Sequence, residues 1–241
     1  MGGMNSAQIF AIGGAGLSLE PDRLALERHI LGRARRPRPA VCYVGTASGD
    51  EDAYTVRFYS AMAQLDCRPS HLPFFRRTPE LRSLLVAQDV IYVGGGNTKS
   101  MLAVWRDWGL PEMLREAWQS GTILCGTSAG AICWFESGVT DSWEHVLYPI
   151  ECLGFLPGAC CPHYDGEKER RPSVQRMVGA GELNEVLALD DGAAAHFEGT
   201  RLARVITSRP KAGAYRVRSD GGAAAQEEAL PVEYVGPPQP G

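Results

Sequence analysis

The chain has 241 residues, 44% of them hydrophobic and 22% charged, and its net charge of −4 provides no basic surface for nucleic acid or anionic lipid. A chain of this length can bury a sufficient core without disulfides, and its apolar runs are shorter than the roughly 20 residues of a membrane span. No secretory signal is visible, and seven cysteines without paired spacing indicate free thiols in a reducing compartment. The composition predicts a globular cytoplasmic protein with no nucleic-acid or membrane partner.

Short apolar runs bounded by glycine alternate with helix-period stretches through the first half of the chain. Strands are predicted at residues 9–12, 40–44, 67–72, 90–93 and 122–125, with helices between them, the first opened by Pro21. Strands that alternate with helices connect by right-handed crossovers. The pattern therefore predicts a single-domain α/β fold, a three-layer sandwich with a mostly parallel sheet.

Beyond about residue 185 the pattern changes to short β runs joined by tight turns. These runs cover residues 186–189, 193–197, 202–206 and 214–217, and we expect them to add antiparallel strands at the edge of the main sheet. The last stretch, residues 221–241, is rich in Gly, Ala, Glu and Pro, which predicts a flexible tail. The domain is accordingly expected to span residues 1–220.

One glycine-rich turn carries the pattern of a nucleophile. Residues 126–130 read Gly-Thr-Ser-Ala-Gly, directly after a predicted strand and before a helix-like stretch. In a nucleophile elbow, flanking glycines let the chain turn sharply and present the serine, here Ser128, above the sheet. The simpler alternative is a glycine-rich strand-to-helix turn with a capping serine. The motif together with its context favours the nucleophile.

Two further glycine clusters follow predicted strands. Residues 94–98 read Gly-Gly-Gly-Asn-Thr, a loop whose backbone N–H groups could approach a reacting carbonyl. It lacks the lysine of a phosphate-binding loop. The cluster at residues 13–16 lacks the third glycine of a dinucleotide fingerprint, so no nucleotide cofactor is expected.

A serine nucleophile needs a base and, in most cases, a carboxylate that orients the base. Of the five histidines, His163 lies in a Cys-Cys-Pro-His-Tyr-Asp run, where Pro162 stiffens the backbone. No second ligand pair at zinc-site spacing accompanies Cys160, Cys161 and His163, so no metal is expected. Spacing alone leaves several carboxylates open: Asp141, Glu144, Asp165, Asp190 and Asp191.

Three motifs, in this order, resemble the peptidase E family of serine peptidases. They are GGGNT at 94–98, GTSAGA at 126–131 and CPHYD at 161–165, within a resemblance that covers about residues 8–207. The run at 128–142 is especially similar to the uncharacterised bacterial branch of that family. The family includes aspartyl dipeptidases and, more distantly, cyanophycinases. The resemblance implies a fold similar to class I glutamine amidotransferases, with serine in place of their cysteine, and no cofactor.

Carried over by position, the resemblance implies roles for individual residues. Ser128 matches the nucleophile and His163 the base, while the backbone N–H groups of Gly96 and Ala129 match the oxyanion hole. Asp191 stands where relatives carry a glutamate, one methylene longer. Asp141 matches another acid that the family tends to carry, and it is the alternative third member or a residue of the substrate site.

The resemblance also suggests how a substrate carboxylate could be read. Aspartyl dipeptidases use an arginine beyond the catalytic histidine for this, and Arg170 or Arg171 would be the candidates here. The alternative is a solvated charged loop, since Glu167 and Glu169 alternate with the basic residues.

The predicted function is a cytoplasmic serine peptidase of short peptides, with Asp-X dipeptides as candidate substrates and a small peptide as its partner. The sequence leaves open whether the chain forms a homo-oligomer. A cyanophycinase- or isopeptidase-type amide hydrolase is the alternative among enzymes. A non-catalytic peptide- or small-molecule-binding protein on the same fold is the alternative of another class. Cys125 and Cys133 flank the elbow, but small thiols on a strand and helix are ordinary core, which argues against a thiol mechanism.

Overall fold

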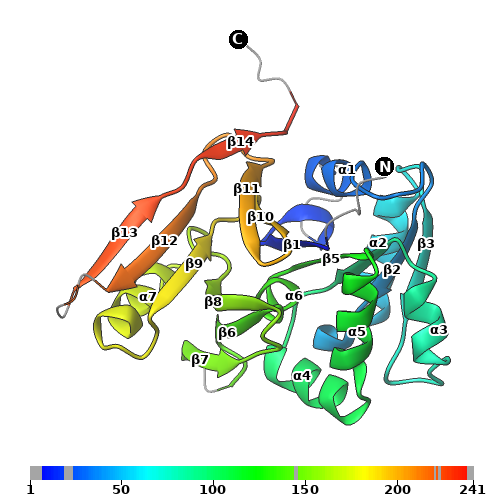
Figure 1. The fold of residues 1–241 in the computed structure, drawn as a ribbon, viewed down its shortest axis with the longest axis horizontal. Coiled ribbons are helices and arrows are strands. Elements are labelled where there is room, and N and C mark those ends of the chain that lie inside the picture. Colours follow the sequence, from blue (N-terminus) through cyan, green and yellow to red (C-terminus); the bar gives the residue numbers. More distant parts are fainter. Residues whose placement is uncertain (1–6, 19–23, 144–145, 220, 222–223, 238–241) are drawn as a thin grey trace.

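The fold is built on two β-sheets that lie side by side (Figure 1). The computed structural model describes residues 7–18, 24–143, 146–219, 221 and 224–237. The larger sheet has eight strands in the order β14-β11-β10-β1-β5-β4-β2-β3. Its strands are β1 (Gln8–Ile12), β2 (Ala40–Val44), β3 (Arg68–Leu72), β4 (Val90–Val93), β5 (Ile123–Thr127), β10 (Ala193–Glu198), β11 (Arg201–Thr207) and β14 (Val232–Tyr234).

Five strands of this sheet, β1 to β5, are parallel and carry helices on both faces, which confirms the predicted three-layer α/β arrangement. Alternate residues of a strand point to opposite faces. Ile9 and Ala11 of β1 join one buried cluster, and Phe10 and Ile12 join another. The first cluster includes residues of α3 (Leu81–Val86), α4 (Thr98–Asp107) and α5 (Leu110–Gln119); the second includes α1 (Ala25–Leu31) and α2 (Asp52–Met62). The expected opening of α1 at Pro21 lies outside the described residues.

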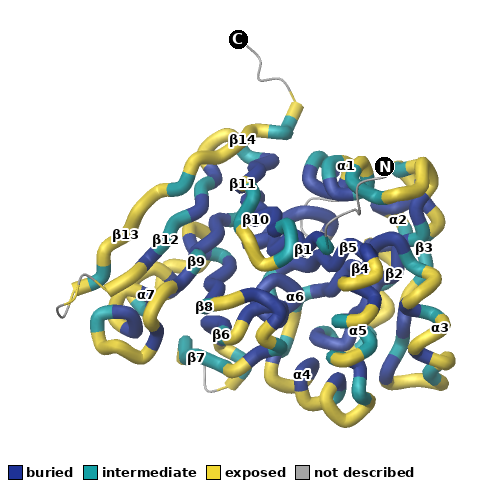
Figure 2. Tube along the Cα trace, in the orientation of Figure 1, coloured by how far each residue is buried: buried dark blue, intermediate teal, exposed yellow. Residues whose placement is uncertain are grey.

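The central strands are buried from end to end, whereas solvent reaches the outer helices and the β13 edge (Figure 2). This burial explains why the strands read as continuous apolar runs rather than alternating ones. No helix in the described part of the chain combines the length and apolar character that crossing a bilayer requires.

The second sheet is the feature that the sequence did not predict. It has six strands in the order β13-β12-β9-β8-β6-β7. Its strands are β6 (Phe135–Thr140), β7 (Tyr148–Glu151), β8 (Leu156–Cys161), β9 (Glu185–Leu189), β12 (Ala214–Ser219) and β13 (Ala225–Ala229), and α7 (Arg170–Gly179) covers one face. The expectation that all late β runs extend the main sheet is right for β10 and β11. It is wrong for β9 and β12, which pair with each other and, through β9, with β8.

The C-terminal stretch also differs from its prediction. Where a flexible tail was expected for residues 221–241, β13 pairs with β12 over five register positions and β14 pairs with β11. Polar and small residues can form these strands because β13 and β14 are held by backbone hydrogen bonds and most of their side chains are exposed. The composition of the stretch carries no signal of that pairing.

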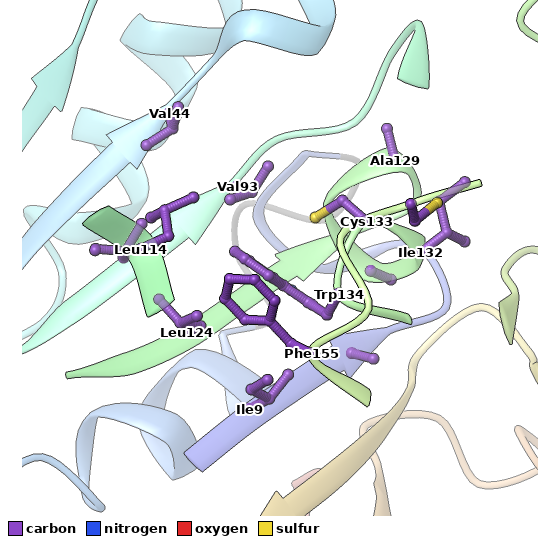
Figure 3. Packing of buried hydrophobic residues seen from close by; sticks show 14 of the residues in the cluster. Ile9, Val44, Val93, Leu114, Leu124, Ala129, Ile132, Cys133, Trp134 and Phe155 are labelled. Atoms are coloured by element: carbon purple, nitrogen blue, oxygen red, sulfur yellow. The ribbon is translucent and has the colours of Figure 1, made fainter. Parts of the chain in front are cut away.

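The core beneath the serine motif holds the large rings of Trp134 and Phe155 among aliphatic side chains (Figure 3). α6 (Ala129–Ile132) follows β5 directly, and fully buried Trp134 lies below it with its ring centroid 5.8 Å from that of Phe155 and 6.4 Å from that of Trp105. Cys133 is buried in the same cluster. Rings of this size fix the position of a short helix because few other packings fill the same volume.

Candidate active site

Ser128 occupies a strained turn between β5 and α6. Its backbone has φ 57° and ψ −113°, a conformation that non-glycine residues rarely adopt. The flanking glycines make room for this turn beside β4. A β-carbon at Gly130 would lie 2.7 Å from the carbonyl carbon of Val93, and one at Gly126 would lie 2.7 Å from the Val93 oxygen. The structure therefore shows the sharp strand-to-helix turn that the motif predicts.

His163 and Asp191 form a pair supplied by the second sheet. His163 follows the end of β8, Asp191 follows the end of β9, and Nδ1 of His163 lies 2.7 Å from Oδ1 of Asp191. Both side chains are mostly buried, at 17% and 14% exposed. The hydrogen bond to His163 lowers the pKa of Asp191, against an opposing effect of burial, so this carboxyl group is ionised near neutral pH.

The end of β1 holds the three segments together. Three successive carbonyl oxygens, of Ile12, Gly13 and Gly14, accept the backbone N–H groups of Ser128 (3.1 Å), His163 (2.9 Å) and Gly192 (3.0 Å). Because β1 runs parallel to β5, its carboxyl end meets the serine turn at one edge of the sheet. One strand end thus sets the relative positions of the serine, the histidine and the aspartate-bearing loop.

Gly14 lies against the His163–Asp191 pair itself. A β-carbon at this position would collide with Oδ1 of Asp191 and Nδ1 of His163 and would lie 2.6 Å from Cε1 of the imidazole. Asp165 braces the other side, since its carboxylate accepts the backbone N–H of Asp191 at 2.8 Å. Neither contact was predicted from the sequence. Paired glycines at the carboxyl end of a predicted strand were the available signal for Gly14.

A pocket of about 160 Å³ opens where these elements meet. In the described part of the chain, four non-glycine residues have positive φ, and three of them line this pocket: Ala15, Ser128 and His163. Strained residues cluster at functional sites because the surrounding structure must maintain them. The remaining lining is Tyr54, Gly95, Gly96 and Thr127. The predicted oxyanion residue Gly96 therefore borders the same space as Ser128, and Ala129 follows Ser128 at the start of α6.

The two arginines that were candidates for binding a substrate carboxylate do not line this pocket. The Arg170 side chain is 4% exposed, and its guanidinium donates to Glu167 (2.7 Å) and to the carbonyl of Val139 (2.9 Å). Arg171 forms an ion pair with Glu227 at 3.0 Å. Both guanidinium groups already have acidic partners, that of Arg171 with its side chain still 46% exposed, so the structure does not bring either arginine to the pocket as expected.

The described acidic candidates that remain, Asp141 and Asp190, have partners other than His163. Asp141 is 56% exposed and lies 3.6 Å from Arg170, while Nδ1 of His163 is hydrogen-bonded to Asp191. Asp190 is buried, its Oδ2 accepts the N–H of Gly213 at 2.8 Å, and burial raises its pKa to about 6. Glu144 lies outside the described residues. Among the residues that are described, no three His, Cys, Asp or Glu side chains gather in a way that could hold a metal ion.

Comparison with known protein families gives one match. Residues 9–205, which include the three motifs, match peptidase family S51. The chain belongs to peptidase family S51. Membership in S51 makes the chain a peptidase, and the matched region contains the segments that form the pocket.

Among relatives of this S51 chain, the uncharacterized peptidase YgaJ of Bacillus subtilis (strain 168) is 50% identical over 230 residues, covering 95% of this chain and 99% of that protein. Peptidase E of Pasteurella multocida (strain Pm70) is 29% identical over 165 residues, 64% of this chain and 68% of that one. Peptidase E of Streptomyces coelicolor (strain ATCC BAA-471 / A3(2) / M145) is 31% identical over 172 residues, 67% and 69% of the two chains.

Solved structures share the fold of this S51 chain. A peptidase from an acI-B1 Actinobacterium superposes with a TM-score of 0.61 at 17% identity, covering 93% of this chain and 95% of that one. A candidate peptidase E protein from Listeria monocytogenes EGD-e gives 0.62 at 20% identity, with 85% and 98% covered. At these identities the likeness concerns the fold.

Proposed function

We propose that the chain is a serine peptidase that hydrolyses short peptides through a Ser128–His163–Asp191 triad. The observation that carries the proposal is the 2.7 Å His163–Asp191 pair beside a strained Ser128 at one pocket. An ionised carboxylate only accepts hydrogen bonds, so Nδ1 of His163 carries the proton that it shares with Asp191. Nε2 is then left with its lone pair, as a base requires.

In this mechanism Ser128 Oγ attacks the scissile carbonyl while Nε2 of His163 takes the hydroxyl proton. The imidazolium is stabilised by Asp191 and returns its proton to the leaving amine. Backbone N–H groups of Gly96 and Ala129 bind the oxyanion. Water, activated by the same histidine, then hydrolyses the acyl-enzyme and restores Ser128.

The substrate class within this proposal is a short peptide, with Asp-X dipeptides as the first members to test. The resemblance to aspartyl dipeptidases supports that choice. The pocket lining, by contrast, contains no arginine or lysine among the described residues, so acid selectivity would have to come from groups beyond that lining. A panel of dipeptides with Asp, Glu, Asn, Ala or Leu at the first position decides between selective and general hydrolysis.

Ser128→Ala is the central test, read by peptide hydrolysis and by labelling with a fluorophosphonate. In subtilisin, loss of the triad serine costs about a million-fold in kcat, and a comparable loss is expected here. The wild-type protein should be labelled and the variant should not. Undiminished hydrolysis by a folded Ser128→Ala protein would defeat the proposal.

A further inference from the structure

A C-terminal segment that lies beyond the family match reaches the His163 loop. The match to S51 ends at residue 205, and the segment that follows forms β12, β13 and β14. The similarity to YgaJ covers 95% of this chain, which is too much to leave this segment out. In Figure 1 the β12–β13 hairpin lies beside α7, at the far end of the second sheet from β7.

The hairpin carries one carboxylate that is hydrogen-bonded to this loop. Oε2 of Glu227 accepts the Tyr164 hydroxyl at 2.6 Å and the Gln175 amide at 3.3 Å, while Oε1 lies 3.0 Å from the guanidinium of Arg171. The Arg171 guanidinium carbon lies 4.8 Å from the ring centroids of both Tyr164 and Tyr215. Glu227 therefore links β13 to α7 and to the residue that follows His163.

Tyr164 connects Glu227 to the turn at His163. It is 2% exposed, and its backbone N–H donates to the Leu189 carbonyl at 3.0 Å, so it is tied to the strand that leads to Asp191. Burial, reinforced by Glu227, raises the pKa of Tyr164 well above its usual range, which keeps the hydroxyl a donor. Its neighbour His163 has φ +53°, a strained conformation that persists only when its surroundings enforce it.

We infer that Glu227 is a positioning residue, which holds the strained His163 turn in register with Asp191 by binding Tyr164 and Arg171. The inference rests on the proposed function, because it assigns the turn a part in that reaction. The same C-terminal segment also reaches the aspartate side of the pair, where an Arg209 nitrogen lies 3.8 Å from Oδ2 of Asp191. The C-terminal segment thus contacts both the His163 loop and Asp191.

Glu227→Ala tests this inference against Glu228→Ala. Glu228 is the next residue on β13, points to the opposite face of the sheet and has its own ion pair with Arg218 at 3.2 Å, so both variants remove one paired carboxylate from one strand. We expect Glu227→Ala to lower kcat about tenfold with KM unchanged, since a displaced base slows chemistry without altering binding. Glu228→Ala should match the wild type.

Tyr164→Phe supplies the second arm, because it keeps the ring and removes only the hydroxyl that donates to Glu227. It should reproduce the kcat loss, and the double variant should be no slower than the slower single, as expected for two partners of one interaction. Glu227→Gln keeps an acceptor for Tyr164 and should recover part of the lost kcat. Unchanged kcat in both folded single variants, or an equal loss in Glu228→Ala, would overturn the inference.

Proton NMR separates this inference from the proposed function. The Nδ1 proton shared by His163 and Asp191 should give a far-downfield resonance in the wild type and in Glu228→Ala, and it should broaden or vanish in Glu227→Ala. Persistence of that resonance in Glu227→Ala refutes the positioning role, whatever the activity. If Ser128→Ala keeps full activity while the resonance behaves as expected, the proposed function fails, although Glu227 still holds the His163–Asp191 pair in place.

Discussion

Gly14→Ala is a specific probe of the site, because the added methyl group points at the His163–Asp191 hydrogen bond. The β-carbon would overlap both atoms of that 2.7 Å bond and lie 2.6 Å from Cε1 of the ring, so the pair cannot keep its present geometry. Gly14 has no positive φ, so alanine fits its backbone and the effect comes from the contact.

The expected loss of kcat/KM can be estimated from the rate enhancement that correct orientation of the catalytic base provides. In the serine-protease template, disabling the aspartate costs about 10⁴ in kcat, so kcat/KM should fall about 10³- to 10⁴-fold, equivalent to about 4–5.5 kcal/mol in the barrier. Overpacking should reduce stability by only about 1–3 kcal/mol, a fall in Tm of about 2–12 °C. The protein should therefore stay folded and lose its activity.

Dipeptide hydrolysis and the rate of fluorophosphonate labelling measure the effect, with thermal unfolding as the check on folding. Gly32→Ala is the matched control. Gly32 has φ −64° at the end of α1, and its added β-carbon would lie 3.3 Å from the Arg28 carbonyl, with nothing of the site nearby. A folded Gly14→Ala protein with the kcat/KM of Gly32→Ala would refute the argument that this contact orients His163.

Three further predictions follow from buried groups. Burial raises the pKa of Asp190 to about 6, so ionising this carboxyl group destabilises the native state. Relative to Asp190→Asn, the wild type should lose about 2–3 kcal/mol of unfolding free energy as the pH rises from about 4 to about 6. Urea unfolding curves at several pH values measure this, and a difference between the two proteins that does not change with pH would contradict it. Arg170→Met should destabilise the fold by about 2–4 kcal/mol, since it leaves the buried Val139 carbonyl without its donor. The substitution should change the KM for Asp-X dipeptides no more than it changes the KM for other dipeptides. A selective rise for Asp-X without loss of stability would instead make Arg170 a substrate reader. All seven cysteines are buried and free, and burial raises the pKa of Cys42 to about 12 and that of Cys125 well above its usual range. A thiol reagent should therefore leave the native activity unchanged and titrate the thiols only after unfolding, whereas rapid inactivation would reopen a thiol mechanism.

Local features of the site were predictable because they depend on neighbours in the chain. Glycines flanking Ser128 after an apolar strand specify a sharp turn whatever surrounds it, and the alternation of apolar runs with helical periods specifies a parallel sheet with its loops at one edge. The positions of Gly96 and Ser128 at that edge follow from the same rule, since parallel strands end on the same side. These features are short-range, and the sequence by itself determined them.

Contacts between distant segments needed the tertiary structure. Composition does not distinguish Asp191 from Asp141, because which carboxylate meets His163 depends on β8 and β9 pairing in a second sheet. The same holds for Arg170, whose place in a charged run suggested solvent although the packing of α7 buries it. The C-terminal strands could not be predicted from the sequence for a related reason. Their stability comes from backbone pairing with β11 and β12, and the N–H and C=O groups that pair are the same for nearly every residue type, so the sequence does not reveal them.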